Sequence, residues 1–108
     1  MTDVLRMKRG DVYAFQHGLE WSDGRPIDLT LAASVTMKMI ADGGEEYVVD
    51  GPMEVFDDVN GIVQRMWDTQ DVATSGMFQV EFVVAFNDGS VITVPSATQL
   101  WLWIMEDL

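Results

Sequence analysis

Few side chains in this sequence have the chemistry of a catalytic group. There is no cysteine, which excludes thiol catalysis, thiolate metal ligands and disulfides together. His17 is the only histidine, and acid–base catalysis by histidine requires a partner group and a cleft. Glu45 and Glu46 follow two glycines, so we expect them at an exposed hairpin tip rather than across a sugar-sized cleft. We predict that the protein is not an enzyme and has no cofactor.

A second group of polar residues is acidic and comprises Asp57, Asp58, Asn60, Asp68 and Asp71. Oxygen-rich loops bind calcium, but the fixed glycine and the closing glutamate of an EF-hand loop are missing here. Solvated turns explain these residues better, with Asp68 as the cap of a single helical turn over residues 68–74. We therefore predict no metal site.

The last strand that we expect, Leu100 to Met105, is apolar on both faces. Leu100, Leu102 and Ile104 alternate with Trp101, Trp103 and Met105. One set can enter a core, and the other should then face water, where exposed aromatic side chains indicate an interaction site. We predict that Trp101, Trp103 and Met105 form a protein interface. Two alternatives remain open, namely stacking of a sugar on the tryptophans and their coverage by the domain's own N-terminal segment.

The N-terminal residues 1–9 form the second candidate site. Arg6, Lys8 and Arg9 are half of the six basic residues in the chain, and Leu5 and Met7 are available beside them to pack. We interpret this segment as an N-terminal arm that reaches an acidic neighbouring subunit. The alternative is a frayed terminus.

The rest of the chain, residues 10–108, is predicted to be one all-β domain. Asp-Gly and Asn-Gly pairs recur along it and favour tight turns, as at Asn60-Gly61 and Asp88-Gly89. Short runs rich in valine, isoleucine, phenylalanine, threonine and methionine separate these turns, which is typical of a sandwich. We expect strands over residues 11–16, 34–40, 47–49, 53–56, 62–67, 77–86, 91–94 and 100–105. The clearest run, 77–86, places Phe78, Val80, Phe82, Val84 and Phe86 on one face and Gln79 and Glu81 on the other.

Composition narrows the possible partners. The net charge is −12 in 108 residues, and such an acidic surface repels nucleic-acid backbones. No apolar run approaches the ~20 residues of a membrane helix, and the N-terminus lacks the apolar segment of a signal peptide. We therefore expect neither nucleic-acid nor membrane partners, and a protein that is made or assembled in a cytoplasm.

Several motifs, taken in order, resemble the immunoglobulin-like N-terminal domain of phage baseplate upper proteins. They are Met7-Lys8-Arg9-Gly10-Asp11, Asp23-Gly24-Arg25-Pro26-Ile27-Asp28-Leu29-Thr30, Ser34-Val35-Thr36-Met37-Lys38-Met39, Gly61-Ile62-Val63-Gln64, Trp67 with Asp71, Gly76-Met77-Phe78-Gln79-Val80-Glu81-Phe82, Asp88-Gly89 and Val94-Pro95. The resemblance spans residues 7–105 and implies an immunoglobulin-like antiparallel β-sandwich of about seven strands.

The resemblance also implies a bacteriophage virion structural protein. We expect a tail- or baseplate-type adaptor that joins neighbouring subunits through protein–protein contacts, as a homo-oligomeric ring in the virion. The alternatives are a carbohydrate-binding adhesion module and a decoration protein on the head or neck of the particle.

Overall fold

The computed structural model of the protein describes residues 2–95 and 99–106, with side chains from residue 4 onward. Its regular structure consists of eight strands, listed here in chain order: β1 (Thr2–Lys8), β2 (Ala14–Gly18), β3 (Ala32–Ala41), β4 (Tyr47–Asp57), β5 (Ile62–Met66), β6 (Gly76–Phe86), β7 (Val91–Val94) and β8 (Gln99–Met105). No helix is present among these residues, and hence none long and apolar enough to span a membrane.

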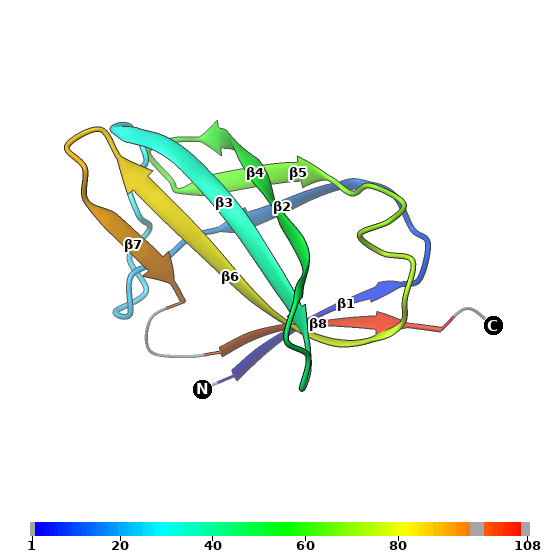
Figure 1. Ribbon diagram of the computed structural model, residues 1–108. Helices are drawn as coiled ribbons and strands as arrows, with labels where there is room; N and C mark the ends of the chain where they lie inside the picture. The colour runs from blue at the N-terminus through cyan, green and yellow to red at the C-terminus, as the bar shows by residue number, and fades with distance from the viewer. Residues whose placement is uncertain (1, 96–98, 107–108) are drawn as a thin grey trace.

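The strands form a curled sheet in the order β1-β8-β6-β3-β4-β5-β2, and β7 pairs with the second half of β6 (Figure 1). Strand β4 belongs to both layers, because Val49–Met53 pair with β3 whereas Glu54–Asp57 pair with β5. The sheet therefore folds over at β4 and encloses an apolar core. The predicted all-β, sandwich-like fold is confirmed.

Strand β6 is the centre of the larger layer. Phe78, Val80, Phe82 and Val84 are buried, while the alternate residues are partly exposed. Period-two burial of this kind is what a sheet with one core face produces. The Asn87–Gly89 turn joins β6 to β7, and the amide of Gly89 bonds the carbonyl of Phe86. The prediction for this hairpin is confirmed.

A partly buried ion pair closes the side of the sandwich where β4 crosses between layers. The Arg65 guanidinium donates to Asp71 Oδ2 from Nε (3.3 Å) and Nη2 (3.1 Å), and from Nη1 to the carbonyl of Pro52 (3.1 Å). A Cβ at Gly51 would lie 2.9 Å from Nη1, so a larger residue there would require the end of the arginine side chain to move. Our prediction of two short strands separated by Gly51-Pro52 is wrong, because the arginine bonds this stretch and β4 continues through it.

Three backbone segments meet at Gly61. Its carbonyl accepts from the amide of Leu19, and the amide of Ile27 donates to the carbonyl of Leu19. Gly61 has φ +69°, and an added Cβ would lie 2.5 Å from the Ile27 oxygen and 2.9 Å from the Leu19 oxygen. Only glycine fits this crossing, which ties the β2–β3 connection to the turn between β4 and β5.

The N-terminal segment is not an arm. Thr2–Lys8 form β1, which pairs in parallel with β8 from Thr2↔Gln99 to Lys8↔Met105. The pairing is mixed rather than purely antiparallel, and the domain begins before residue 10. The physical reason is the alternation of apolar Leu5 and Met7 with charged Arg6 and Lys8, which suits a strand with one buried face.

The predicted helical turn over residues 68–74 is a hydrogen-bonded turn without a helix. Asp68 Oδ1 accepts from the amide of Gln70 at 3.0 Å, which is the capping role expected of it. The carboxylate of Asp71 accepts from the amide of Asp68 as well as from Arg65. These bonds fix the position of Asp71 within the turn.

Candidate functional site: a tryptophan face on the outside of the sheet

The outer surface of β1, β8 and β6 carries the residues predicted to form an interface. Register places Val4 and Gln79 on either side of Trp101, and Arg6 and Met77 on either side of Trp103. Paired residues point to the same side of a sheet. We call this surface the tryptophan face and define it as Val4, Arg6, Lys8, Met77, Gln79, Trp101, Trp103 and Met105.

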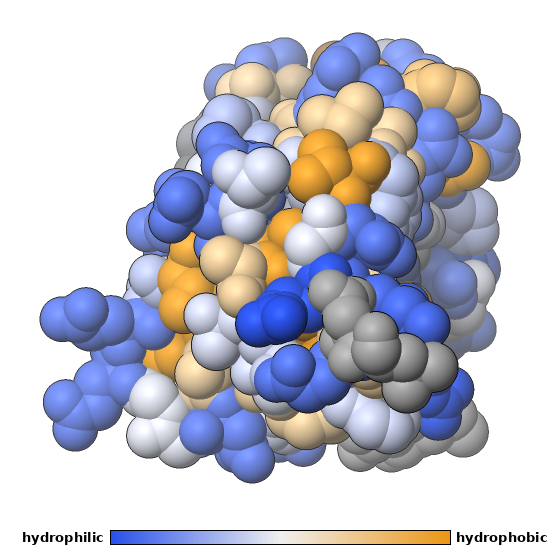
Figure 2. Space-filling view, turned by 90° about the vertical axis from the view of Figure 1, so that its right-hand side faces the viewer, coloured by the Kyte–Doolittle hydropathy of each residue, from blue (hydrophilic) through white to orange (hydrophobic). Residues whose placement is uncertain are grey.

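The two sets of residues in β8 separate as expected. Leu100, Leu102 and Ile104 are buried, whereas Trp103 remains 41% exposed and Trp101 and Met105 are partly exposed. Figure 2 shows the end of the molecule where β1 and β8 finish, and there polar side chains predominate and apolar ones form small separate groups. Exposed aromatic side chains are not confined to the tryptophan face, because Tyr13, Trp21, Tyr47 and Phe56 are also exposed.

The N-terminal candidate residues divide between two environments. Met7 is buried in the core and Leu5 packs against it, so neither side chain is available to a partner. Arg6 and Lys8 are exposed on the tryptophan face, and Arg9 lies beyond the end of β1 with a long contact of 3.9 Å to Glu106. The prediction that Leu5 and Met7 contact a neighbour is wrong. Residues alternate between the two faces of β1, and these two lie on the face that is turned to the core.

The charges of this face are unusual for so acidic a protein. Among the described side chains, Arg9, Arg25 and Arg65 lie within 4 Å of a carboxylate, and the other three basic residues, Arg6, Lys8 and Lys38, do not. Lys38 pairs in register with Glu81 of β6, so it projects from the same side of the sheet as the tryptophan face. All three of these cations thus lie on one side of the molecule, where Asp50 of β4 and Glu81 of β6 flank Lys38 in register.

Two of these cations are held by aromatic rings. Arg6 Cζ lies 5.8 Å from the centre of the Trp103 ring, and Lys38 Nζ lies 5.2 Å from that of Tyr47. A cation over an aromatic face is attracted by about 0.5–1 kcal/mol when exposed. The Trp103 ring orients the charge of Arg6 without neutralising it, so this charge stays available to an anionic partner.

His17 lies inside the sandwich rather than at the end of a loop. It belongs to β2, and its ring stacks on Phe82 of the other layer at 5.3 Å and on Phe15 at 6.1 Å. The residue acts as a packing ring between the layers in this arrangement, and it faces away from the tryptophan face.

The acidic cluster of the sequence separates into two turns at opposite ends of β5. Asp57 accepts from the amide and side chain of Asn60, and Asp58 accepts from the amide of Val59. The described part of the chain contains no group of three or more histidine, aspartate or glutamate side chains placed to hold a metal ion. Glu45 and Glu46 are exposed in the β3–β4 connection, as expected.

Comparison with known proteins informs the fold alone. No protein-family model matches the sequence, and no curated protein is significantly similar to it. Among solved structures, a similar one is the crystal structure of CopC from Methylosinus trichosporium OB3b, with a TM-score of 0.56 and 13% sequence identity. The match covers 98% of this chain and 87% of that chain. At this identity the two proteins share a β-sandwich-like architecture.

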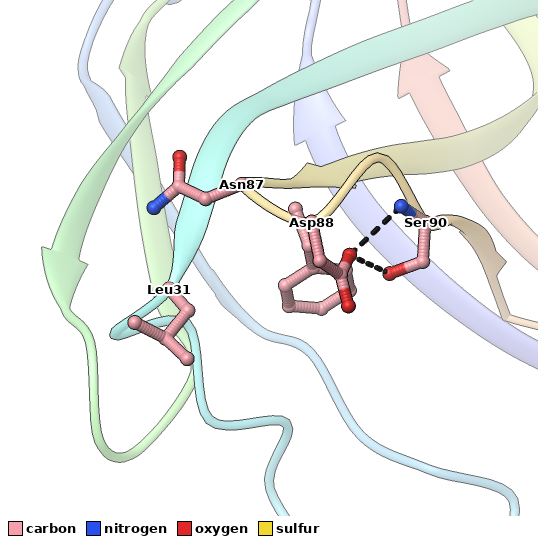
Figure 3. Close-up of a pocket in the computed structure, with 5 residues that line it drawn as sticks. Leu31, Asn87, Asp88 and Ser90 are labelled. Atoms are coloured by element: carbon pink, nitrogen blue, oxygen red, sulfur yellow. Dashed lines mark hydrogen bonds between the residues drawn. The ribbon is translucent and has the colours of Figure 1, made fainter.

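A hollow of about 500 Å³ lies beside the turn from β6 to β7, at the end of β6 that does not pair with β8 (Figure 3). Leu31, Phe86, Asn87, Asp88 and Ser90 line it. Asp88 Oδ1 accepts from the hydroxyl and the amide of Ser90, at 2.6 and 2.8 Å. The carboxylate is therefore occupied in shaping the turn, although an apolar wall beside polar groups could also receive a small polar ligand.

These bonds predict a measurable titration. The Ser90 hydroxyl, followed by its amide, lowers the pKa of Asp88 below its ordinary value of 3.8. The stabilisation of the turn is therefore full above pH 3.8 and is lost as the pH falls through the lower folded-state pKa. By NMR titration, Ser90→Ala should raise the pKa of Asp88. The pKa of Asp28, lowered in the same way by Thr30, should not change, and equal shifts at both sites would contradict the assignment.

Proposed function

We propose that this protein is a non-catalytic adaptor that binds a neighbouring protein subunit through its tryptophan face. The observation that carries the proposal is the 41% exposure of Trp103 at the centre of an ordered sheet surface, beside Arg6 and Met77. Tryptophan, methionine and arginine are enriched in the cores of protein interfaces. A sheet that is hydrogen-bonded on both sides of β8 holds these side chains in place before a partner arrives, which lowers the entropic cost of binding.

The biological setting that we propose is a bacteriophage particle. It rests on the resemblance of residues 7–105 to the N-terminal domain of baseplate upper proteins. In this setting the adaptor is a virion structural protein of the tail or baseplate, assembled in the host cytoplasm. The same face would also serve a decoration protein on the head or neck.

Replacing Trp103 with serine should weaken the association strongly. A tryptophan buried by a partner contributes at least about 2 kcal/mol, so Kd should rise by roughly 30-fold or more. The experiment mixes the purified protein with the products of the neighbouring genes and measures complex mass by light scattering and Kd by calorimetry. The side chain is largely outside the core, so circular dichroism should show a folded variant.

Trp21→Ser is the matched control, because Trp21 is also 41% exposed but lies in the β2–β3 connection, away from the tryptophan face. It should bind as tightly as the unmodified protein. An unchanged Kd for Trp103→Ser would overturn the proposal.

A second candidate function is carbohydrate binding. The side chains of Trp101 and Trp103 project from the same face of one strand and could stack a sugar, and polar groups line the hollow beside Asp88. A glycan array would decide between the candidates. Glycan binding that Trp103→Ser removes, without any protein complex, would replace the adaptor with an adhesion module.

A further inference from the structure

We infer that the partner of the tryptophan face is a second copy of this chain, which binds through the acidic hairpin between β4 and β5. This inference rests on the proposed function and specifies its partner. The contact would be head to tail, with the tryptophan face of one copy on a different surface of the next.

The distribution of charge is the first feature that favours this contact. Three of the six basic residues, Arg6, Lys8 and Lys38, project from one side of the sheet without an ion pair to a described side chain. The other three contact carboxylates of their own chain. The 18 acidic residues far outnumber them, so the remaining surface is strongly negative. An acidic surface that complements Arg6 and Lys8 is therefore present on the molecule itself.

The second feature is a surface on which acidic residues and exposed apolar residues lie together. Between Lys38 and Arg65 the sequence contains seven aspartates and glutamates and no lysine or arginine. The β4–β5 hairpin in this stretch also exposes large apolar side chains, with Phe56 57% exposed. We call this surface the hairpin patch and define it as Glu54, Phe56, Asp58 and Val59. It offers carboxylates for Arg6 and Lys8 and an apolar centre for Trp103.

The third feature is the separation of the tryptophan face from the hairpin patch within one molecule. In the strand order, β1 lies at one end of the sheet and β4, β5 and β2 at the other. Figure 1 shows β1 and β8 at the bottom of the view and the arrowhead of β4 at the top. One copy therefore cannot satisfy both surfaces by itself. A contact between two different surfaces of identical chains repeats, and it generates a closed ring or an open filament.

The overall charge does not prevent this contact. At physiological ionic strength the Debye length is about 8 Å, so distant like charges on two copies are largely screened. The longest dimension of the molecule is 45 Å, so acidic groups at the far end lie several Debye lengths from a contact at the other end. Charges within the contact are screened much less.

Sedimentation velocity at about 0.15 M salt tests the inference. We expect the unmodified protein to form assemblies larger than a monomer as its concentration rises. Trp103→Ser, which removes one surface, and Glu54→Gln/Phe56→Ser, which alters the other, should each be monomeric. Val91→Ser is the matched control, because Val91 is 59% exposed on β7 and should leave assembly unchanged.

Mixing the two defective variants gives the sharpest result. Each retains one intact surface, so the mixture should form a one-to-one heterodimer and nothing larger. Assembly of the unmodified protein that survives Glu54→Gln/Phe56→Ser would overturn the hairpin patch, and a chain that stays monomeric at ~100 μM would overturn self-association. In the latter case, a complex with another protein that Trp103→Ser abolishes would still support the proposed function.

Discussion

Gly61→Ala should lower the free energy of unfolding by about 2–5 kcal/mol, the sum of a left-handed backbone penalty and of forced backbone movement. The new methyl group would lie 2.5 Å from the carbonyl oxygen of Ile27 and 2.9 Å from that of Leu19. Both are backbone atoms, which cannot turn aside as the end of a flexible side chain can. Their displacement would disturb the Leu19–Gly61 and Ile27–Leu19 hydrogen bonds. Thermal unfolding should show a melting temperature lower by roughly 10 °C or more.

Gly43→Ala separates the two causes. Gly43 has a similar φ of +75°, but nothing lies within 4 Å of its added Cβ. This variant should therefore lose only the left-handed backbone term, about 1–2 kcal/mol. If both variants unfold with the same free energy, the crossing at Gly61 is not a steric constraint.

Arg65→Met should destabilise the protein by about 3 kcal/mol, which is typical of removing one partner from a buried ion pair. The side chains of Arg65 and Asp71 are only 19% and 9% exposed. The substitution leaves the Asp71 carboxylate away from water with only the amide of Asp68 as a donor. It also removes the bond to the Pro52 carbonyl that joins β4 to β5. Urea unfolding with an unchanged m-value would assign the loss to the native state.

A double variant and an exposed pair provide the controls. Arg65→Met/Asp71→Leu removes both charges, so it should be more stable than the sum of the single variants predicts. Arg25→Met removes the exposed pair with Asp23 and should change stability little, because exposed ion pairs are screened by water and salt. Strictly additive losses for Arg65 and Asp71 would contradict direct coupling between them.

The sequence predicted β6 and its hairpin well because a single physical cause governs them. Phe78, Val80 and Phe82 alternate with polar residues, and Asp88-Gly89 supplies the turn. Strand β1 was harder to predict, because three basic residues in the first nine suggested a solvated arm. The alternation of Leu5 and Met7 with Arg6 and Lys8 carried the strand signal. A parallel partner at the other end of the chain cannot be deduced from local pattern.

The candidate site was predicted in part. The doubly apolar pattern of residues 100–105 correctly placed Trp103 on an exposed face, since a strand can bury only one of its sides. The juxtaposition of Arg6 with Trp103 depends on the β1–β8 register, which no local motif specifies. The Arg65–Asp71 ion pair was missed, although Arg65 shares a strand face with Val63, which is buried. A charged side chain on a core face is a signal that a partner must be sought.

The parallel pairing of β1 with β8 also has a mechanical consequence. The chain enters β1 at Thr2 and leaves β8 at Met105, and the register places these two residues at opposite ends of the paired strands. A pulling force applied between them acts along the strands and loads the interstrand hydrogen bonds together. In a hairpin pulled from its open end, by contrast, such bonds break one after another. The first and last of the described strands thus form a shear joint.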